Sequence, residues 1–512
     1  MAILIRGGLI VTGDTQDRRL PAGDLLLRDG RIAAIGPDLA AEAAALGEPV
    51  ETIDARQSIV MPGLVNAHTH SNEGFEQGAY DNLPLELWLL ESYPPEGMPA
   101  LTERQHYLRT MITAIQSIRS GVTMVQDDLL HAACTPEGLD GAARAYLDTG
   151  LRANITVTLW NQGMLDSLPF AREIIPAELQ RKLRESPIPT TKDYIDLFHR
   201  HYRNWHGREG RLGVILGPCA PQRCSRDLLE ECAALSVSLD LPIHCHVLET
   251  RTQAVTAAAL YNRTMVAHLA DLGLLTHRTT LNHAIWLTAE DIARVGDARA
   301  SVTHNPLSNM KLGSGVCPVR ELREAGANVA LGSDGPTTSD TADMIEVMRA
   351  AALLHKLGDA DYERWGTAAD AFRMATMGGA RSCLAQDRIG SLEPGKSADV
   401  ILLDRNAWGF IPLNDPVRQL AFSVHSEAVT HSIVGGRVLM RERRLESIDE
   451  AAIKAEVAEE AERFRREDMP RMRAGAAPLR PHVAAIYRRA MGTPLPGLPD
   501  MGQPSPTSLA AR

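Results

Sequence analysis

The sequence has few of the features that mark secreted, membrane or nucleic-acid-binding proteins. Its 512 residues include only seven cysteines, an odd number without regular spacing, which does not form the disulfide framework of a small secreted domain. No run of about 18 apolar residues is present, which argues against a membrane span. The 53 basic and 64 acidic residues give a net charge of −11, which disfavours nucleic acid as a partner. The first residues do not follow the pattern of a signal peptide, so we expect a cytoplasmic protein with reduced thiols.

The two ends of the sequence share a pattern that is typical of small antiparallel strands. Short apolar runs punctuated by glycine and aspartate occur in residues 1–60, for example at 24–27 and 31–36. A similar pattern returns at 398–404 and 431–438. We therefore expect the two ends to pair into one small β-sandwich.

The middle of the chain alternates strand and helix patterns. Eight candidate strands lie near residues 64–68, 122–127, 153–160, 212–217, 242–247, 279–284, 300–304 and 328–333. Helical patterns such as 227–235 separate most of them, which predicts an α/β fold with a (β/α)8 barrel.

These patterns also predict a division of the chain. Residues 1–60 and 386–445 form the two parts of the β-sandwich, and residues 61–385 form the barrel. The remainder, 446–512, begins with a charged helix at 449–468. It ends in a Pro- and Gly-rich tail from residue 492 that we expect to be disordered or wrapped on the surface.

Four groups of potential metal ligands lie far apart in the chain, each at the end of a predicted strand. They contain His68 and His70, His244 and His246, the pair Asn282–His283, and Asp334. Because side chains alternate along a strand, both histidines of the first group share one face and can reach the same ion. A hydrolytic metal centre needs imidazole and carboxylate donors with one position open for water, and the ends of parallel barrel strands bring such donors together. The pattern indicates a metal-dependent hydrolase.

Five longer motifs resemble one known group of enzymes. They are Pro62–His70, His246–Thr250, His304–Gly315, Gly332–Gly335 and Gly390–Asp399. On these motifs the chain resembles the amidohydrolase superfamily, in the branch that contains cytosine deaminase, guanine deaminase, the adenosylhomocysteine/methylthioadenosine deaminases and the triazine hydrolases. The resemblance covers about residues 1–445.

The resemblance implies a mononuclear metal site with the ligands His68, His70, His246 and Asp334. His244 competes with His246 because both point inward, and the family's spacing of three residues between the metal histidine and an acidic residue favours His246. The fourth strand ends in Gly217-Pro218 without a lysine that would bridge two metals. We expect one Zn²⁺ per chain, and Fe²⁺ also fits such a donor set.

The resemblance also implies catalytic roles for three residues. Glu249 is expected to protonate the ring nitrogen beside the attacked carbon and later the departing amine. His283 is expected to orient the attacking water and polarise that carbon. Asp334 is expected to hold the nucleophile by a hydrogen bond in addition to its role as a ligand.

Other residues bear on the substrate. Trp88, Trp160, Gln162, Cys219, Ser308 and Asn309 are the candidate substrate-binding residues. Gln162 carries a primary amide that suits the edge of a heteroaromatic ring, although a loop cap is the alternative. Ser308 and Asn309 either fix a loop over the site or touch the substrate directly. Cys219 stands where the nucleoside-type deaminases of this branch have histidine, and Glu73 and Glu76 either add charge at the mouth or belong to a solvated loop.

The sequence therefore predicts a deaminase that releases ammonia from a small nitrogen heterocycle such as a free base, a pterin or a triazine-like ring. The alternative keeps the site but breaks another C–N or a C–Cl bond, and a non-catalytic scaffold protein is a further, disfavoured alternative. S-adenosylhomocysteine and methylthioadenosine are expected to be poor substrates because of Cys219 and the altered segment 71–78. We expect a homodimer or larger homo-oligomer, with no nucleic-acid or membrane partner.

Overall fold

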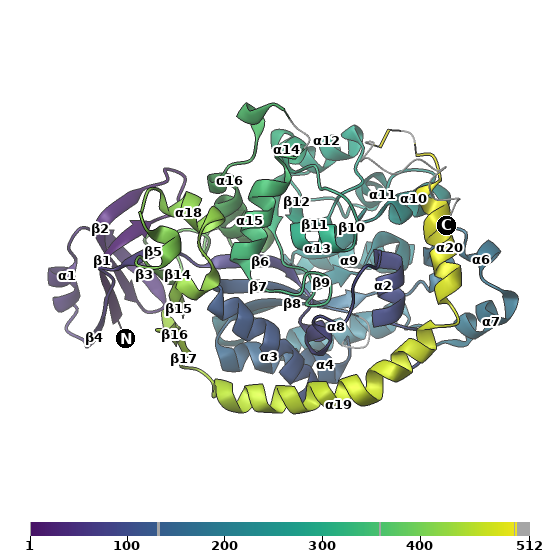
Figure 1. Ribbon diagram of the computed structural model, residues 1–512, viewed down its shortest axis with the longest axis horizontal. Helices are drawn as coiled ribbons and strands as arrows, with labels where there is room; N and C mark the ends of the chain where they lie inside the picture. The colour runs from purple at the N-terminus through teal and green to yellow at the C-terminus, as the bar shows by residue number, and fades with distance from the viewer. Residues whose placement is uncertain (1, 131–133, 358–359, 496, 499–512) are drawn as a thin grey trace.

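The computed structural model of the chain describes residues 2–130, 134–357, 360–495 and 497–498. Its centre is a sheet of eight parallel strands that pair in sequence order (Figure 1). The strands are β6 (Leu64–Thr69), β7 (Val122–Leu129), β8 (Arg152–Leu159), β9 (Leu212–Pro218), β10 (Ile243–Val247), β11 (Thr279–His283), β12 (Ser301–His304) and β13 (Asn328–Leu331). All eight lie where the sequence predicts them, and the α/β barrel is confirmed.

The barrel closes between β13 and β6 through a few specific contacts. Thr69 and Asp334 form an isolated parallel bridge, and the Asp334 amide donates to the His68 carbonyl at 2.9 Å. Next to this contact, the Asn66 side chain of β6 donates to Ser333 Oγ at 2.8 Å and accepts from the Ser333 backbone amide at 3.0 Å. The seam of the barrel is therefore formed by the same segments that carry the predicted metal ligands.

Nine strands from both chain ends form a second sheet, at the left of Figure 1. They are β1 (Ala2–Val11), β2 (Arg19–Arg28), β3 (Arg31–Gly36), β4 (Val50–Asp54), β5 (Ser58–Pro62), β14 (Val400–Asp404), β15 (Val429–Val434), β16 (Arg437–Arg441) and β17 (Arg444–Leu445). Antiparallel pairing of β5 with β14 joins the two ends, for example Val60 opposite Leu402, which confirms that the ends share one small β unit. A buried ion pair between Arg152 of β8 and Asp399, at 3.1 Å, connects this sheet to the barrel.

The helices lie around the barrel, apart from α1, which packs against β1 of the second sheet. They are α1 (Ala40–Ala44), α2 (Leu85–Ser92), α3 (Glu103–Arg119), α4 (Pro136–Thr149), α5 (Met164–Ser167), α6 (Ala171–Ile174), α7 (Ala177–Glu185), α8 (Thr191–Trp205), α9 (Arg226–Leu239), α10 (Arg251–Tyr261), α11 (Met265–Asp271), α12 (Ala289–Asp297), α13 (Pro306–Lys311), α14 (Val319–Glu324), α15 (Met344–Leu354), α16 (Ala368–Arg373), α17 (Gly379–Ser382), α18 (Pro416–Phe422), α19 (Glu450–Ala476) and α20 (Arg480–Met491). Several begin at a threonine whose hydroxyl and a following Gln or Asp form a reciprocal capping box, as Thr102 and Gln105 do for α3. In the parts of the chain that the structure covers, no helix is both long and apolar enough to cross a membrane.

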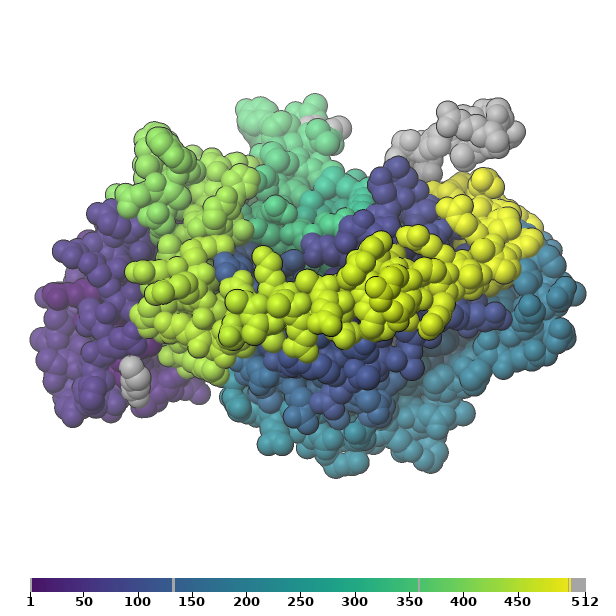
Figure 2. All heavy atoms as spheres, turned by 60° about the horizontal axis from the view of Figure 1, so that its bottom comes forward, coloured from purple at the N-terminus to yellow at the C-terminus, as the bar shows by residue number. Residues whose placement is uncertain are grey.

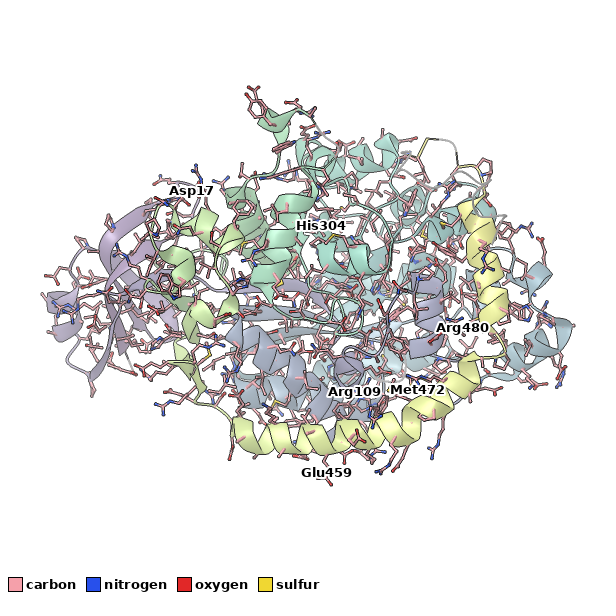
Figure 3. All side chains as sticks on the ribbon, in the orientation of Figure 1. Asp17, Arg109, His304, Glu459, Met472 and Arg480 are labelled. Carbon is pink, nitrogen blue, oxygen red and sulfur yellow. The ribbon has the colours of Figure 1, made fainter. Side chains whose placement is uncertain are left out.

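The C-terminal helices form an arm across the barrel (Figure 2). Helix α19 extends to Ala476, eight residues beyond the predicted end, because Phe464 and Met472 bury their side chains against α3 and the turn after β6. Arg109 of α3 lies over the Phe464 ring at 5.3 Å, and Figure 3 shows Arg109 beside Met472 where the arm crosses. Helix α20 then packs on α2 and α10, and Arg480 pairs with Glu91 of α2 at 2.7 Å. Most of the predicted tail, residues 499–512, lies outside the described residues.

Candidate metal centre and substrate cavity

Four predicted ligands converge at the carboxyl end of the barrel. His68 and His70 come from the end of β6, His246 from β10, and Asp334 from the turn after β13. Asp334 Oδ1 lies 3.0 Å from His70 Nε2 and 3.3 Å from His68 Nε2, and His246 Nε2 lies 3.4 Å from His70 Nε2. All four side chains are buried or nearly so.

The spacing of these atoms fits one divalent metal ion. Nitrogen and oxygen donors bound tetrahedrally to zinc at about 2.0–2.1 Å lie roughly 3.3 Å from one another, which matches the observed separations. His68 Nε2 and Asp334 Oδ1 are buried and have no hydrogen-bond partner among the described residues. Such orphaned buried groups are costly unless a ligand satisfies them, so the donor set fits a metal by chemistry as well as by distance.

The opposite nitrogen of each histidine is already engaged. His70 Nδ1 donates to the Asp128 carbonyl at 2.6 Å, and His246 Nδ1 donates to the Cys219 carbonyl at 2.8 Å. His68 Nδ1 lies 2.7 Å from His244 Nε2. Burial lowers the pKa of His244 to about 3, so this ring is neutral and its Nε2 can accept a hydrogen bond from His68 Nδ1. These contacts fix each ring with Nε2 toward the centre, as supporting hydrogen bonds do at metal sites.

Asp128 is a candidate that the sequence reasoning missed. It lies near the end of β7, where the hydroxyls of Thr156 and Thr158 donate to its Oδ1, and its Oδ2 lies 3.6 Å from His246 Nδ1. Asp128, His68 and His244 form a second group whose potential ligand atoms lie within 4.8 Å of one another. The signal in the sequence was the pair Asp127-Asp128, which ends a predicted strand and is followed by Leu129-Leu130.

Glu249 and His283 lie beside the four-ligand centre. His283 Nε2 is 3.8 Å from Glu249 Oε2 and 4.0 Å from Asp334 Oδ2. Burial, with the nearby Asp334 and Glu86 charges, raises the pKa of Glu249 well above its usual range. Burial lowers the pKa of His283 to about 4, so its ring is neutral. The pair thus combines a carboxyl whose protonated form is favoured by burial with a neutral imidazole.

Ser308 contacts Asp334 and Asn309 contacts His283, and neither residue lines the cavity. Ser308 Oγ donates to Asp334 Oδ2 at 2.5 Å. His283 Nδ1 lies 2.9 Å from Asn309 Oδ1 and 3.2 Å from Asn305 Nδ2. In the tautomer in which Nδ1 donates to Asn309, Nε2 keeps its lone pair on the Glu249 side. Asp334 has a φ of 64° and His283 a φ of 68°, values that non-glycine residues rarely adopt outside constrained sites.

Glu73 and Glu76 do not lie in a solvated loop and add no exposed charge at the mouth. Both are buried in the 3₁₀ turn η1 (Ser71–Glu76). Glu73 accepts from the Thr337 hydroxyl and from Tyr93 Oη at 2.9 Å, and a Cβ at Gly335 would clash with its carboxylate. Glu76 pairs with Arg109 at 3.1 Å. Glu73 thus holds the turn that follows Asp334, which explains why glycine follows that ligand.

A cavity of about 520 Å³ opens beside the centre. His70, His246, Glu249, His283 and Asp334 line it, as do Trp88 and Cys219 from the predicted substrate set. Trp160 and Gln162 are not among its lining residues. They follow β8 in a segment that turns toward Arg223. The Arg223 guanidinium lies 5.5 Å from the centre of the Trp160 ring, and the Arg223 carbonyl accepts from the Gln162 backbone amide at 3.0 Å.

Other lining residues were not predicted. The apolar wall consists of Leu85, Leu89 and Leu130, and further polar groups come from Gln222, Arg223, Gln253 and Thr338. Trp88 Nε1 and Gln222 Oε1 are buried and have no hydrogen-bond partner in the described part of the chain. These two atoms, one donor and one acceptor, are candidate partners for a bound molecule, beside the other polar groups that line the cavity.

Comparison with known proteins identifies the family. A sequence profile described as "Amidohydrolase family" matches residues 59–439, most of the chain. The chain belongs to the amidohydrolase family. It is 33% identical over 467 residues to a 5-methylthioadenosine/S-adenosylhomocysteine deaminase from Desulforamulus reducens, which covers 90% of this chain and 99% of the relative. It is 34% identical to a 5'-deoxyadenosine deaminase from Methanothermobacter thermautotrophicus, over 86% of this chain and 94% of the relative.

Solved structures share the fold of this amidohydrolase. An adenosine deaminase from Xanthomonas campestris with bound zinc superposes with a TM-score of 0.79 at 29% identity, over 90% of this chain and 98% of that chain. A variant of the atrazine chlorohydrolase TrzN from Arthrobacter aurescens, complexed with zinc and atraton, gives 0.81 at 25% identity, over 90% and 100%. The resemblance stated from the motifs is confirmed, and the chain is a hydrolase that acts on C–N bonds.

Proposed function

We propose that this amidohydrolase removes an exocyclic amine from a nitrogen heterocycle by hydrolysis and releases ammonia. The observation that carries the proposal is Glu249, a buried acid that lines the cavity beside a complete set of metal donors. An amine is a poor leaving group and must be protonated before it departs, so an acid at this position suits C–N cleavage.

The proposed roles follow from the contacts of each side chain. A divalent metal held by His68, His70, His246 and Asp334 would supply Lewis acidity and activate a water for attack. Ser308 holds the Asp334 carboxylate in place, and Asp334 Oδ2 can accept a proton from that water.

His283 and Glu249 act on the substrate side of the cavity. The neutral His283, with Nδ1 bound to Asn309, directs Nε2 toward the reacting atoms. The raised pKa of Glu249 favours its protonated form, and this acid donates its proton to the ring nitrogen beside the attacked carbon. The carboxylate so formed takes the proton that remains on the oxygen of the added water and passes it to the departing amine, while the proton first accepted by Asp334 restores the acid. A positioned acid of this kind contributes about 10²–10⁴-fold to the rate.

The walls of the cavity favour a flat ring with both donor and acceptor groups at its edge. Trp88 Nε1 is a free donor and Gln222 Oε1 a free acceptor, while Leu85 and Leu89 provide apolar surface for the ring faces. Burial raises the pKa of Cys219 to about 11, so its thiol is neutral and a weak hydrogen-bonding group for a ribose. Within the proposal we therefore place free bases, pterins and triazine-like rings first.

Adenosine-type compounds are the second candidate substrate class. They are favoured by the relatives described above, whose names specify methylthioadenosine, S-adenosylhomocysteine and 5'-deoxyadenosine. Ammonia release should be measured for adenine, guanine, a pterin and aminotriazines beside these three nucleosides. If a nucleoside exceeds every free ring by more than about tenfold in kcat/KM, roughly 1.4 kcal/mol in transition-state binding, the second candidate replaces the first.

A matched assay addresses the alternative leaving groups. Chloride and alkylamine release from chlorinated and alkylated triazines should be slow compared with ammonia release. Faster chloride than ammonia release would contradict the proposed deaminase activity, whatever ring is preferred.

Four further properties belong to the same proposal. They are one zinc ion per chain rather than iron, a homodimer or larger homo-oligomer, a cytoplasmic location, and the division into residues 1–60 with 386–445, 61–385 and 446–512. Elemental analysis, sedimentation, cell fractionation and limited proteolysis test them in that order.

A further inference from the structure

A second cavity of about 620 Å³ adjoins the metal cavity. The two share a wall of Leu85, Leu89, Gln222, Arg223 and Gln253, so a single ligand can extend from one into the other. We propose that the second cavity binds a cationic amine on the substrate's side chain through the buried carboxylate of Glu86. This inference rests on the proposed function, because it assigns the part of the substrate that lies beyond the ring.

Glu86 is a buried acid with one oxygen unused. It lies in the first turn of α2, lines the second cavity and is 7% exposed. Thr250 Oγ1 donates to Glu86 Oε1 at 2.7 Å. Glu86 Oε2 is buried without a hydrogen-bond partner, and no arginine or lysine of the described residues forms an ion pair with Glu86.

An unpaired carboxylate in such a place is unfavourable unless something compensates it. Burying an ionised group without a partner costs several kcal/mol. Burial accordingly raises the pKa of Glu86. The surrounding wall combines apolar side chains, such as Leu90, Met164 and Leu168, with neutral hydroxyls. The Thr252 hydroxyl stabilises the charged form of Glu86 in part, but a neutral group does not supply a positive charge. A ligand ammonium would supply the missing charge and donate to Oε2.

Arg223 does not remove this need. It lies in the shared wall, and its guanidinium faces the Trp160 ring at 5.5 Å, on the β8 side of the cavity. The two cavities therefore differ in charge. The shared wall carries the Arg223 cation. Among the residues that line only the second cavity, Glu86 is the one carboxylate, and none is a lysine, arginine or histidine. A substrate with a neutral ring in the metal cavity and a basic side chain in the second cavity matches this distribution of charge.

The competing explanation is that Glu86 only supports the neighbouring turn. Through Thr250, the N-cap of α10, it contacts the residue that follows Glu249. A purely structural acid would make no distinction between ligand side chains of equal size. Side-chain discrimination is therefore the readout that separates the two roles.

The test uses purines without an exocyclic amine, so that binding is measured without turnover. Three such purines carry an aminopropyl, a butyl or a carboxyethyl chain on the imidazole ring. Calorimetry on the metal-loaded full chain gives Kd for each ligand, with the wild type, Glu86→Gln and Glu91→Gln. Glutamine at position 86 keeps an acceptor for Thr250 but has no charge. Glu91→Gln is the matched control, because Glu91 is on the same helix and pairs with Arg480.

We expect the wild type and Glu91→Gln to bind the aminopropyl purine at least about tenfold more tightly than the butyl purine, and the carboxyethyl purine least well. In Glu86→Gln this preference should disappear. Equal affinities, a preference for the butyl or carboxyethyl chain, or no binding of any of the three in the wild type would overturn the proposal. An unchanged preference in Glu86→Gln would do the same, and if that variant does not fold, the wild-type order alone decides.

The failure of the proposed function is visible separately. Ammonia release from the corresponding aminopurines tests deamination and does not enter the comparison of affinities. A protein that binds the aminopropyl purine selectively but releases no ammonia keeps the amine site and loses the deaminase assignment.

Discussion

The metal side and the substrate side of the cavity differ in how their polar atoms are satisfied. On the metal side His68, His70 and His246 each have Nδ1 held by a carbonyl or by His244, while His68 Nε2 and Asp334 Oδ1, which face the centre, have no hydrogen-bond partner among the described residues. On the substrate side, Trp88 Nε1 and Glu86 Oε2 of α2 and Gln222 Oε1 of the turn after β9 are buried without hydrogen-bond partners among the described residues. The first arrangement fixes geometry in advance of binding, whereas the second leaves groups for a ligand to satisfy.

The largest expected effect is the loss of a ligand on the metal side. Asp334→Ala should lose the metal and activity together, because it removes the one carboxylate that lies within 3.3 Å of two histidine nitrogens. Elemental analysis and ammonia release measure both. Chelation of the wild type should give the same loss, with recovery on addition of Zn²⁺. Two metals per chain in the wild type would contradict the mononuclear prediction and direct attention to Asp128 and His244.

Glu249→Gln should affect turnover without affecting metal binding. Glutamine keeps the shape but has no proton to transfer, so kcat should fall by about 10²–10⁴-fold while the metal content stays unchanged. Steady-state kinetics with elemental analysis checks this. A wild-type rate in this variant would refute the role of Glu249 as the acid.

The dependence of activity on pH should also reflect the role of Glu249 as the acid. Burial raises the pKa of Glu249, and the acid must be protonated to act. Activity should therefore be highest below this raised pKa and decline as the pH rises through it. In Glu249→Gln the residual rate should lack this alkaline decline, and an identical decline in both proteins would assign it to another group.

His244→Phe tests whether the support behind a ligand matters. It removes the partner of His68 Nδ1, and loss of such a supporting contact typically weakens metal affinity by about 10–100-fold. Competition with a chelator measures the affinity. His201→Phe is a control, since His201 is a buried histidine on α8 that does not line the cavity. Equal metal affinity in all three proteins would show that the contact is dispensable.

The smallest expected effect compares two glutamines. Gln222→Leu should raise KM by about tenfold, the loss expected when one hydrogen bond to the ring is removed, with little change in metal content. Gln162→Leu should leave KM unchanged, because Gln162 does not line the cavity. The reverse result would restore the sequence-based assignment of Gln162.

Much of the centre was visible in the sequence because its signals are local. The His68-Thr69-His70 alternation, the position of each group at a strand end and the glycine after Asp334 depend on residues close in the chain. The same holds for the eight barrel strands, whose apolar runs and spacing match the structure. The end of α19 was missed because tertiary burial of Met472, not local propensity, carries that helix past Pro470.

The sequence by itself determined the family, the barrel and the set of donor residues, because strand periodicity and the order of parallel strands bring the donors to one rim. Only the tertiary structure decided which polar groups face the cavity. Gln162 and Gln222 both follow barrel strands, and the path of the chain after each strand directs only Gln222 to the cavity. Likewise the sequence does not distinguish Glu73 and Glu86 from exposed acidic residues. Their burial depends on neighbours that are distant in the chain.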